Sequence, residues 1–278
     1  MANEYVLVDR KDGVVTLTMN DPSTLNAWNG TMASELLDEL IAAEQAPADR
    51  VVILTGTGKV GFNSGANMKE MARRGSIQTQ TDLAARNADR DPFERFDPPL
   101  TAIQKVTWKL RSMHKPTIAA VNGAAAGGGM GLAAACDIRI ASENAKFTSV
   151  FVRRGLVPDE GSIYLLPQIV GYSKALELVM TGRLIDAREA ERIGFVSRVV
   201  PPDELMTESH KLAREIVINC PPITLGLVKS VMVRSVGLDF QQTMRMADTG
   251  FGISIATEDH REAVRAYAEK REPHFQGK

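Results

Sequence analysis

The stretch PTIAAVNGAAAGGGMGLAAACDIRIAS, residues 116–142, decides the fold of this chain. It holds a short apolar run at 117–121, a glycine-rich loop leading into an alanine-rich segment at 127–137, and a second apolar run at 138–142. Short apolar runs bounded by glycine or polar residues are typical of buried strands, and the segment between these two has the composition of a helix. The stretch therefore predicts a strand, a helix and a second strand, the repeating unit of a mainly parallel sheet covered by helices.

The same alternation occurs nearer the N-terminus. The runs VVTLTM (14–19) and VVILTG (51–56) have strand character, and the segment between them predicts a helix because its apolar residues recur at helical spacing: Met32, Leu36, Leu37, Leu40 and Ile41. Beyond residue 201 strand patterns fade, and amphipathic helical patterns take their place at 202–218 and 259–271. We expect an α/β core over residues 1–200 and a helical C-terminal region over 201–278.

Composition excludes several classes of function. The chain has 278 residues, enough for a sizeable core, and 33 Lys and Arg against 34 Asp and Glu. This balance lacks the basic excess of a general nucleic-acid or anionic-membrane binder. No run reaches the ~18 apolar residues of a membrane helix, and no secretion signal is evident. We expect a cytoplasmic protein that binds neither nucleic acid nor membrane.

The two cysteines and the four histidines do not suggest a metal site. Cys136 and Cys220 are spaced neither as a disulfide framework nor as a zinc site, so both fit small buried residues in a reducing compartment. The histidines lie far apart in loops or on polar helical faces, where a surface role is favoured: His114, His210, His260 and His274. We therefore expect no bound metal.

Two glycine-bearing loops are the candidates for a functional site. The first, GFNSGANMKEM (61–71), follows the strand at 51–56, and the second lies within 121–137; each leads toward a predicted helix. The N–H groups at a helix N-terminus attract negative charge, and glycine lets a ligand approach the main chain. Two such loops facing one another could hold one oxyanion. The alternative is a purely structural role, in which consecutive glycines merely permit close helix packing.

Other catalytic patterns are absent from the sequence or incomplete. Residues 129–134 match G-x-G-x-x-A, but the acid that a dinucleotide site needs about 20 positions later is missing, because Glu143 comes too early and Lys146 has the wrong sign. There is no G-x-S-x-G, H-E-x-x-H, Walker or C-x-x-C motif. Backbone oxyanion binding and a carboxylate remain, a combination that suits chemistry through an enolate.

The chain resembles the crotonase superfamily, also called the enoyl-CoA hydratase/isomerase family. The resemblance runs nearly end to end, through STLNAW, FNSGANMKEM, the stretch from residue 116 to KF at 146–147, GLVPDEGSIYLLPQIVG, ALELVMTGRLIDAREAERIGFVSRVV and AYAEKREPHF. It implies a spiral of ββα units with a helical C-terminal region that mediates trimers, often paired into hexamers. It also implies an acyl-CoA thioester substrate, with no cofactor beyond the CoA that the substrate carries.

The resemblance assigns roles to the first glycine loop and its counterpart. The N–H groups of Ala66 and Gly128 would form the oxyanion hole for the thioester carbonyl. The backbone from Ser64 through Gly65 to Ala66 would curl around CoA, and Lys69 would approach the nucleotide phosphates.

Two C-terminal residues also match family positions for CoA. Tyr267 and Lys270 correspond to positions from which a neighbouring subunit can touch CoA. For Lys270, as for Lys69, a place on a solvated helix surface is an equally good interpretation as contact with CoA.

The positions at which the chain departs from the family pattern are as informative as those at which it matches. A hydratase carries one glutamate three residues past the oxyanion glycine and a second after the next strand, where this chain has Gly131 and Phe151. Both hydratase acids are therefore missing. Asp159, in GLVPDEGSIYLLP, matches the acid of some isomerases of the family, and apolar surroundings would raise its pKa. We expect Glu160 to be the exposed neighbour, and the alternative for Asp159 is a turn or capping residue after Pro158.

The remaining residues concern the acyl group. An apolar pocket would be lined near Gly131 by Met71, Met130, Leu132 and Phe151, although core packing explains each side chain equally well. Residues 72–98 are polar and aperiodic, either a mobile surface insertion or a cover for the site.

The favoured activity is double-bond isomerisation of an enoyl-CoA by the oxyanion hole and Asp159. One alternative is hydration or hydrolysis of an unsaturated, cyclic or aromatic acyl-CoA. In the relative 4-chlorobenzoyl-CoA dehalogenase the matching aspartate is a nucleophile, but the histidine that this enzyme needs corresponds to Gln104 here. The other alternative is a non-catalytic relative.

Overall fold

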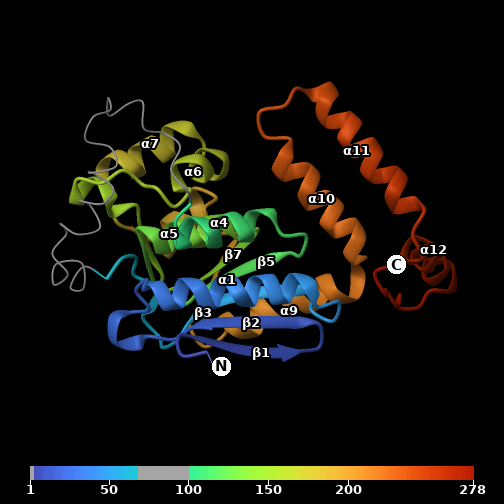
Figure 1. Ribbon diagram of the computed structural model, residues 1–278, viewed down its shortest axis with the longest axis horizontal. Coiled ribbons are helices and arrows are strands. Elements are labelled where there is room, and N and C mark those ends of the chain that lie inside the picture. Colours follow the sequence, from blue (N-terminus) through green and yellow to red (C-terminus); the bar gives the residue numbers. More distant parts are fainter. Residues whose placement is uncertain (1–2, 68–99) are drawn as a thin grey trace.

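The computed structural model describes residues 3–67 and 100–278 (Figure 1). Its larger sheet has six strands in the order β1-β2-β3-β5-β7-β10, of which β1 is antiparallel to β2 and the other pairs are parallel. The bounds are β1 Val6–Lys11, β2 Val14–Met19, β3 Val51–Gly56, β5 Thr117–Val121, β7 Ile138–Ser142 and β10 Arg198–Val200. The strands predicted at 14–19, 51–56, 117–121 and 138–142 are confirmed as β2, β3, β5 and β7.

A smaller sheet runs beside the first in the order β4-β6-β8-β9. Its strands are β4 Gly61–Asn63, β6 Ala124–Ala126, β8 Lys146–Thr148 and β9 Ile185–Asp186. In three places a strand of the large sheet is followed directly by one of the small sheet, as β3 by β4, β5 by β6 and β7 by β8. This repetition is the spiral of ββα units that the resemblance implied.

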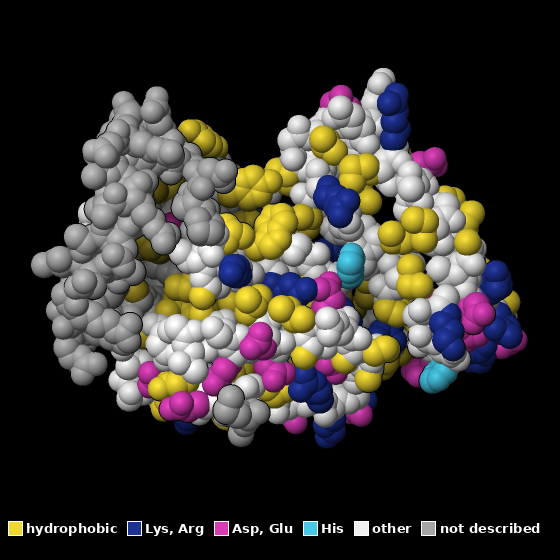
Figure 2. Space-filling view, viewed as in Figure 1, with side chains coloured by type: hydrophobic (Ala, Val, Ile, Leu, Met, Phe, Trp, Pro, Cys, Tyr) yellow, Lys and Arg dark blue, Asp and Glu magenta, His cyan; other side chains and the backbone are white. Residues whose placement is uncertain are grey.

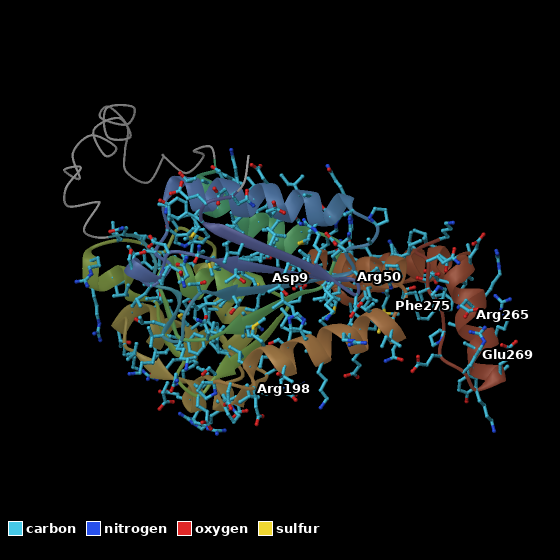
Figure 3. All side chains as sticks on the ribbon, turned by 90° about the horizontal axis from the view of Figure 1, so that it is seen from below. Asp9, Arg50, Arg198, Arg265, Glu269 and Phe275 are labelled. Atoms are coloured by element: carbon cyan, nitrogen blue, oxygen red, sulfur yellow. The ribbon has the colours of Figure 1, made fainter. Side chains whose placement is uncertain are left out.

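The helices cover both faces of the large sheet. Their bounds are α1 Gly30–Gln45, α4 Ala102–Ser112, α5 Gly128–Ala135, α6 Ser162–Val170, α7 Tyr172–Thr181, α8 Ala187–Arg192, α9 Leu205–Asn219, α10 Pro222–Arg234, α11 Phe240–Ile255 and α12 Glu258–Glu269, with short 3-10 helices η1 Pro22–Thr24 and η3 Val150–Arg154. Figure 3 shows α1 and α9 on opposite sides of the sheet. On β3, Val52 and Leu54 join the core under α1, whereas Val51 and Ile53 pack toward α9.

The helix predicted between the strands at 14–19 and 51–56 is confirmed as α1. Met32, Leu36 and Leu40 on one face are fully buried, while Leu37 and Ile41 are half-buried at its edge. The Asn29 side chain caps the helix, because its Oδ1 accepts a hydrogen bond of 2.8 Å from the Met32 N–H.

The C-terminal region is helical, as predicted, and its first helix belongs with the sheet. Helix α9 buries Leu205 and Ala213 against the large sheet, whereas α10, α11 and α12 extend to one side (Figure 1). Lys229 ties α10 to the core: its Nζ donates to Asp137 Oδ2 at 2.7 Å and to the Leu110 carbonyl at 2.8 Å.

Both cysteines carry free thiols. Cys136 is buried, as predicted, and burial raises the pKa of its thiol to about 12, whereas Cys220 is half-buried at the end of α9. Arg50, labelled in Figure 3, donates to the Cys220 carbonyl at 3.1 Å and so connects the start of β3 to that helix end.

None of the helices in the described residues is by itself long and apolar enough to cross a membrane. Helices α9 and α10 satisfy the length and composition criteria when taken together, but the chain bends by 111° between them.

Candidate active site

The two glycine loops lie side by side. A Cβ atom placed on Gly65 would lie 2.5 Å from the Ala126 carbonyl oxygen and 3.5 Å from the Gly128 nitrogen. Gly65 also has a φ of +84°, which side chains rarely adopt. The first loop can therefore approach the start of α5 because this position carries no side chain.

A second contact explains part of the glycine run by packing. A Cβ on Gly129 would lie 1.8 Å from the Asn63 carbonyl oxygen, so no side chain fits between β4 and α5 at that position. Gly128 differs, since its nearest neighbour is the indole of Trp28, with Nε1 2.9 Å from a Cβ on this residue. Close packing therefore explains why residue 129 is glycine. Gly128 instead lies beside the polar indole N–H of Trp28.

The N–H groups of Gly128 and Ala66 are not used within the described part of the chain. Helix α5 begins at Gly128, so that N–H belongs to the first turn, where helical partners are missing. Gly127 donates to the Thr148 carbonyl at 2.9 Å, and Met130 donates to Gly127 at 2.9 Å, but no described acceptor receives the Gly128 or Ala66 N–H. The helix dipole favours negative charge at this end of α5.

Trp28 connects the two loops, a role that the sequence did not reveal. Its backbone N–H donates to the Gly65 carbonyl at 2.8 Å, and its backbone pairs with Ala66. The buried indole Nε1 lies beside Gly128 and has no hydrogen-bond partner among the described residues. In the sequence Trp28 is only the last residue of STLNAW, next to a predicted helix.

The segment between η3 and α6 corrects one expectation. Glu160 is the buried residue of the acidic pair, with 2% of its surface exposed, and Asp159 is the exposed one. The Asp159 carbonyl accepts a hydrogen bond of 2.8 Å from Gln104 Nε2, and Gly161 has a φ of +99°. The prediction that Glu160 is exposed and that apolar surroundings enclose Asp159 is therefore wrong: the turn directs the longer side chain inward.

The Glu160 side chain lies against Gly131 on α5. A Cβ on Gly131 would lie 2.3 Å from Glu160 Cγ and 2.6 Å from its Oε1. Neither carboxyl oxygen has a hydrogen-bond partner in the described chain, and the same holds for the buried Ser162 hydroxyl. Burial raises the pKa of the Glu160 carboxyl to about 7, although the nearby Ser162 hydroxyl opposes the shift. The site thus contains a carboxyl group suited to carrying a proton near neutral pH.

The other predicted residues divide by position. The Ser64 hydroxyl donates to the Thr24 carbonyl at 2.8 Å, which fixes the first loop. Met130 and Leu132 are fully buried in the main core. Phe151, half-buried in η3, faces Gly127, with ring atoms 3.5 Å from a Cβ on that residue.

Some predicted residues are not brought to the two loops. Tyr267, 88% exposed, and Lys270 lie at the end of α12, and Figure 1 shows α12 far from α5. The resemblance assigns both residues to contact with CoA bound by a neighbouring subunit, which stays a prediction. Lys69, Met71 and the segment 72–98 lie outside the described residues.

Comparison with known proteins identifies the class. The family model described as enoyl-CoA hydratase/isomerase matches residues 9–278. Crotonyl-CoA hydratase from Syntrophomonas wolfei is 34% identical over 275 residues, 99% of both chains. Short-chain-enoyl-CoA hydratase from Clostridium acetobutylicum is 35% identical over 266 residues, 96% of this chain and 95% of that one.

Comparison with solved structures indicates the same family. The enoyl-CoA hydratase from Bacillus anthracis superposes with a TM-score of 0.89 at 31% identity, over 99% of this chain and all of that one. The enoyl-CoA hydratase from Mycobacterium smegmatis gives 0.83 at 28% identity, over 98% and 99%. The chain has the crotonase fold. It belongs to the enoyl-CoA hydratase/isomerase family.

Proposed function

We propose that this protein is an enoyl-CoA isomerase that moves a carbon–carbon double bond along the acyl chain. The observation that carries the proposal is the pairing of two unused backbone N–H groups, on Gly128 and Ala66, with one buried carboxyl group next to α5. An acyl-CoA thioester as the substrate is consistent with the family to which the chain belongs.

The chemistry requires one group that moves a proton and one that stabilises negative charge. The carboxylate would remove a proton from C2 of a 3-enoyl thioester, and the electron pair would move toward the carbonyl oxygen. That oxyanion would be held by the two N–H groups, a contribution of about 3 kcal/mol per donor. The same carboxyl would return the proton at C4, which leaves the double bond between C2 and C3 with no net change of atoms.

Hydration is the second candidate, because the relatives compared above are named hydratases. The family's water-adding pair of acids would stand at positions 131 and 151. Here Gly131 has no side chain, and Phe151 is apolar. This absence favours isomerisation. Hydrolysis through a nucleophilic Asp159 is a weaker third candidate, since Gln104 stands at the position of the histidine that the dehalogenase requires.

Self-association is a further part of the proposal. We infer a homotrimer, or a hexamer made of two trimers, built on the C-terminal helices. Figure 2 shows hydrophobic side chains on the visible face of this region. Exposed apolar residues there include Val228, Met232, Met244, Phe251 and Val264. The proposed substrate brings its own CoA, and no separate cofactor enters the reaction.

The test is direct. The protein is incubated with matched 3-enoyl- and 2-enoyl-CoA esters in ordinary and heavy water, and the products are separated by chromatography and identified by mass and NMR. Isomerisation gives the shifted double bond with no addition of water, whereas hydration adds one water to the 2-enoyl ester. Failure to bind any CoA ester would refute the proposal.

A further inference from the structure

We propose that Glu160, and not the adjacent Asp159, is the catalytic acid of this enzyme, and that it works from the space that Gly131 leaves open on α5. The inference rests on the proposed function and names the residue that would carry the proton.

The two acids differ in where their side chains lie. Glu160 is directed into the protein and packs on the glycine face of α5, whereas Asp159 is exposed. The turn is fixed from the other side by Gln104, whose Oε1 accepts from the Thr101 N–H at 2.8 Å while its Nε2 donates to the Asp159 carbonyl. The capping box of α4 thus holds the backbone in the orientation that sends Glu160 inward.

Helix geometry places the Glu160 carboxyl within reach of an acyl chain. Gly128 and Gly131 are three residues apart on α5 and so share one face, with Cβ positions about 5–6 Å apart. Glu160 Oε1 lies 2.6 Å from the Cβ position of Gly131, which puts it within about 9 Å of the Cβ position of Gly128. When the thioester oxygen is bound at Gly128, C2 lies two bonds and C4 four bonds from that oxygen. A contact of about 3–3.5 Å between the carboxyl and either carbon then covers the remaining distance to Glu160.

A structural role does not account for the Glu160 side chain. Buried carboxyls that stabilise a fold are paired or hydrogen-bonded, because an unpaired buried charge is costly. Within the described chain no well-formed hydrogen bond reaches the carboxyl oxygens of Glu160 or the Ser162 hydroxyl, although Ser162 and the backbone of the turn lie close enough to favour the charged form. A buried carboxyl without a well-formed hydrogen bond, on the same face of α5 as the unused Gly128 N–H, is the arrangement expected of a site completed by its substrate.

Few titratable groups face Glu160 from the described elements that pack around it. Helix α5 contributes no titratable residue, α4 contributes Thr107 and Gln104 on this side, and α6 begins with the uncharged Ser162. The charge of the acidic neighbour Asp159 acts on the Glu160 carboxyl, and like burial it favours the protonated form. A pH dependence of activity near neutral pH would therefore report the Glu160 carboxyl.

In the proposed step the Glu160 carboxylate breaks the C2–H bond and becomes the carboxylic acid, while the thioester becomes a dienolate held at Gly128 and Ala66. The acid then protonates C4 and returns to the carboxylate, so no oxidant, reductant or co-reactant is needed.

The experiment compares Glu160→Gln with Asp159→Asn, two changes that keep shape and remove charge. We expect Glu160→Gln to lower kcat on a 3-enoyl-CoA by about 10²–10⁴-fold with little change in KM, and Asp159→Asn to stay within about tenfold of the wild type. Circular dichroism and binding of a saturated acyl-CoA show that both variants are folded. The reverse pattern, an inactive Asp159→Asn beside an active Glu160→Gln, would overturn the inference.

A second comparison separates catalysis from packing. Glu160→Ala is compared with the double variant Glu160→Ala, Gly131→Glu, which returns a carboxyl to the same space from α5. At least tenfold recovery of kcat in the double variant is expected if the position of the carboxyl matters, and no recovery would contradict it. A wild type that binds CoA esters but isomerises none would instead refute the proposed function itself, whatever the variants do.

Discussion

The Glu160 side chain occupies the space into which a side chain on Gly131 would project, with Cγ 2.3 Å from the position of that missing Cβ. Two residues from different elements thus share one place, and only one of them can fill it. This relationship predicts coupling between substitutions at the two positions.

Gly131→Ala should therefore be costly while Glu160 is present. The added methyl group forces the buried glutamate aside, and overpacking of this kind costs about 1–3 kcal/mol. In the double variant Gly131→Ala, Glu160→Ala the space is free again, so most of that cost should disappear. Urea denaturation of the wild type, both single variants and the double variant measures the coupling. Additive free energies of unfolding would show that the two side chains do not compete.

The close approach of the two glycine loops gives a second prediction. Gly65→Ala places a Cβ 2.5 Å from the Ala126 carbonyl oxygen and should separate the loops, lowering kcat/KM by about a hundredfold or more. Gly58→Ala is the matched control, because Gly58 has a similar φ of +82° and no atom within 4 Å of its Cβ position. Both variants carry backbone strain, so equal losses of activity would attribute the effect to strain alone.

The pKa of Glu160 predicts how stability depends on pH. Burial raises this pKa from its usual 4.5 to about 7, so the folded state binds the proton more tightly than the unfolded state. The resulting stabilisation is complete below about pH 4.5 and is lost as pH rises through about 7, a loss of about 3 kcal/mol. Glu160→Gln should lack this decline. Chemical denaturation at pH 5 and pH 8 checks it, and parallel curves for the two proteins would contradict it.

The anchor of α10 predicts a stability effect remote from the site. Lys229 is 9% exposed and donates to Asp137 and to two backbone carbonyls, so Lys229→Ala should cost about 2–3 kcal/mol. Lys211→Ala is the control, since Lys211 is 73% exposed and pairs with Glu208 at 3.6 Å. Its effect should stay within about 0.5 kcal/mol. Thermal or urea unfolding distinguishes the two, and similar effects would remove Lys229 as an anchor.

Local pattern was enough for much of the fold. Strands β2, β3 and β7 and helices α1, α5, α9 and α12 follow from apolar periodicity and glycine, because these signals act over a few neighbouring residues. The glycine-bearing loops were also visible, since a run of residues without Cβ has few purposes other than close approach of the backbone. The resemblance supplied the order of the ββα units and the expectation of an oxyanion hole.

The choice between Asp159 and Glu160 needed the tertiary structure. Both acids stand in one turn, and the sequence does not fix which side chain faces inward, because that depends on Gly161, on the hydrogen bond from Gln104 and on the empty position at Gly131. Gly161 adjoins the two acids, but Gln104 belongs to α4 and Gly131 to α5, both distant from the turn along the chain. The sequence by itself determined that an acid lies in this turn beside an α/β core; packing between α4, α5 and the turn decided that the buried acid is Glu160.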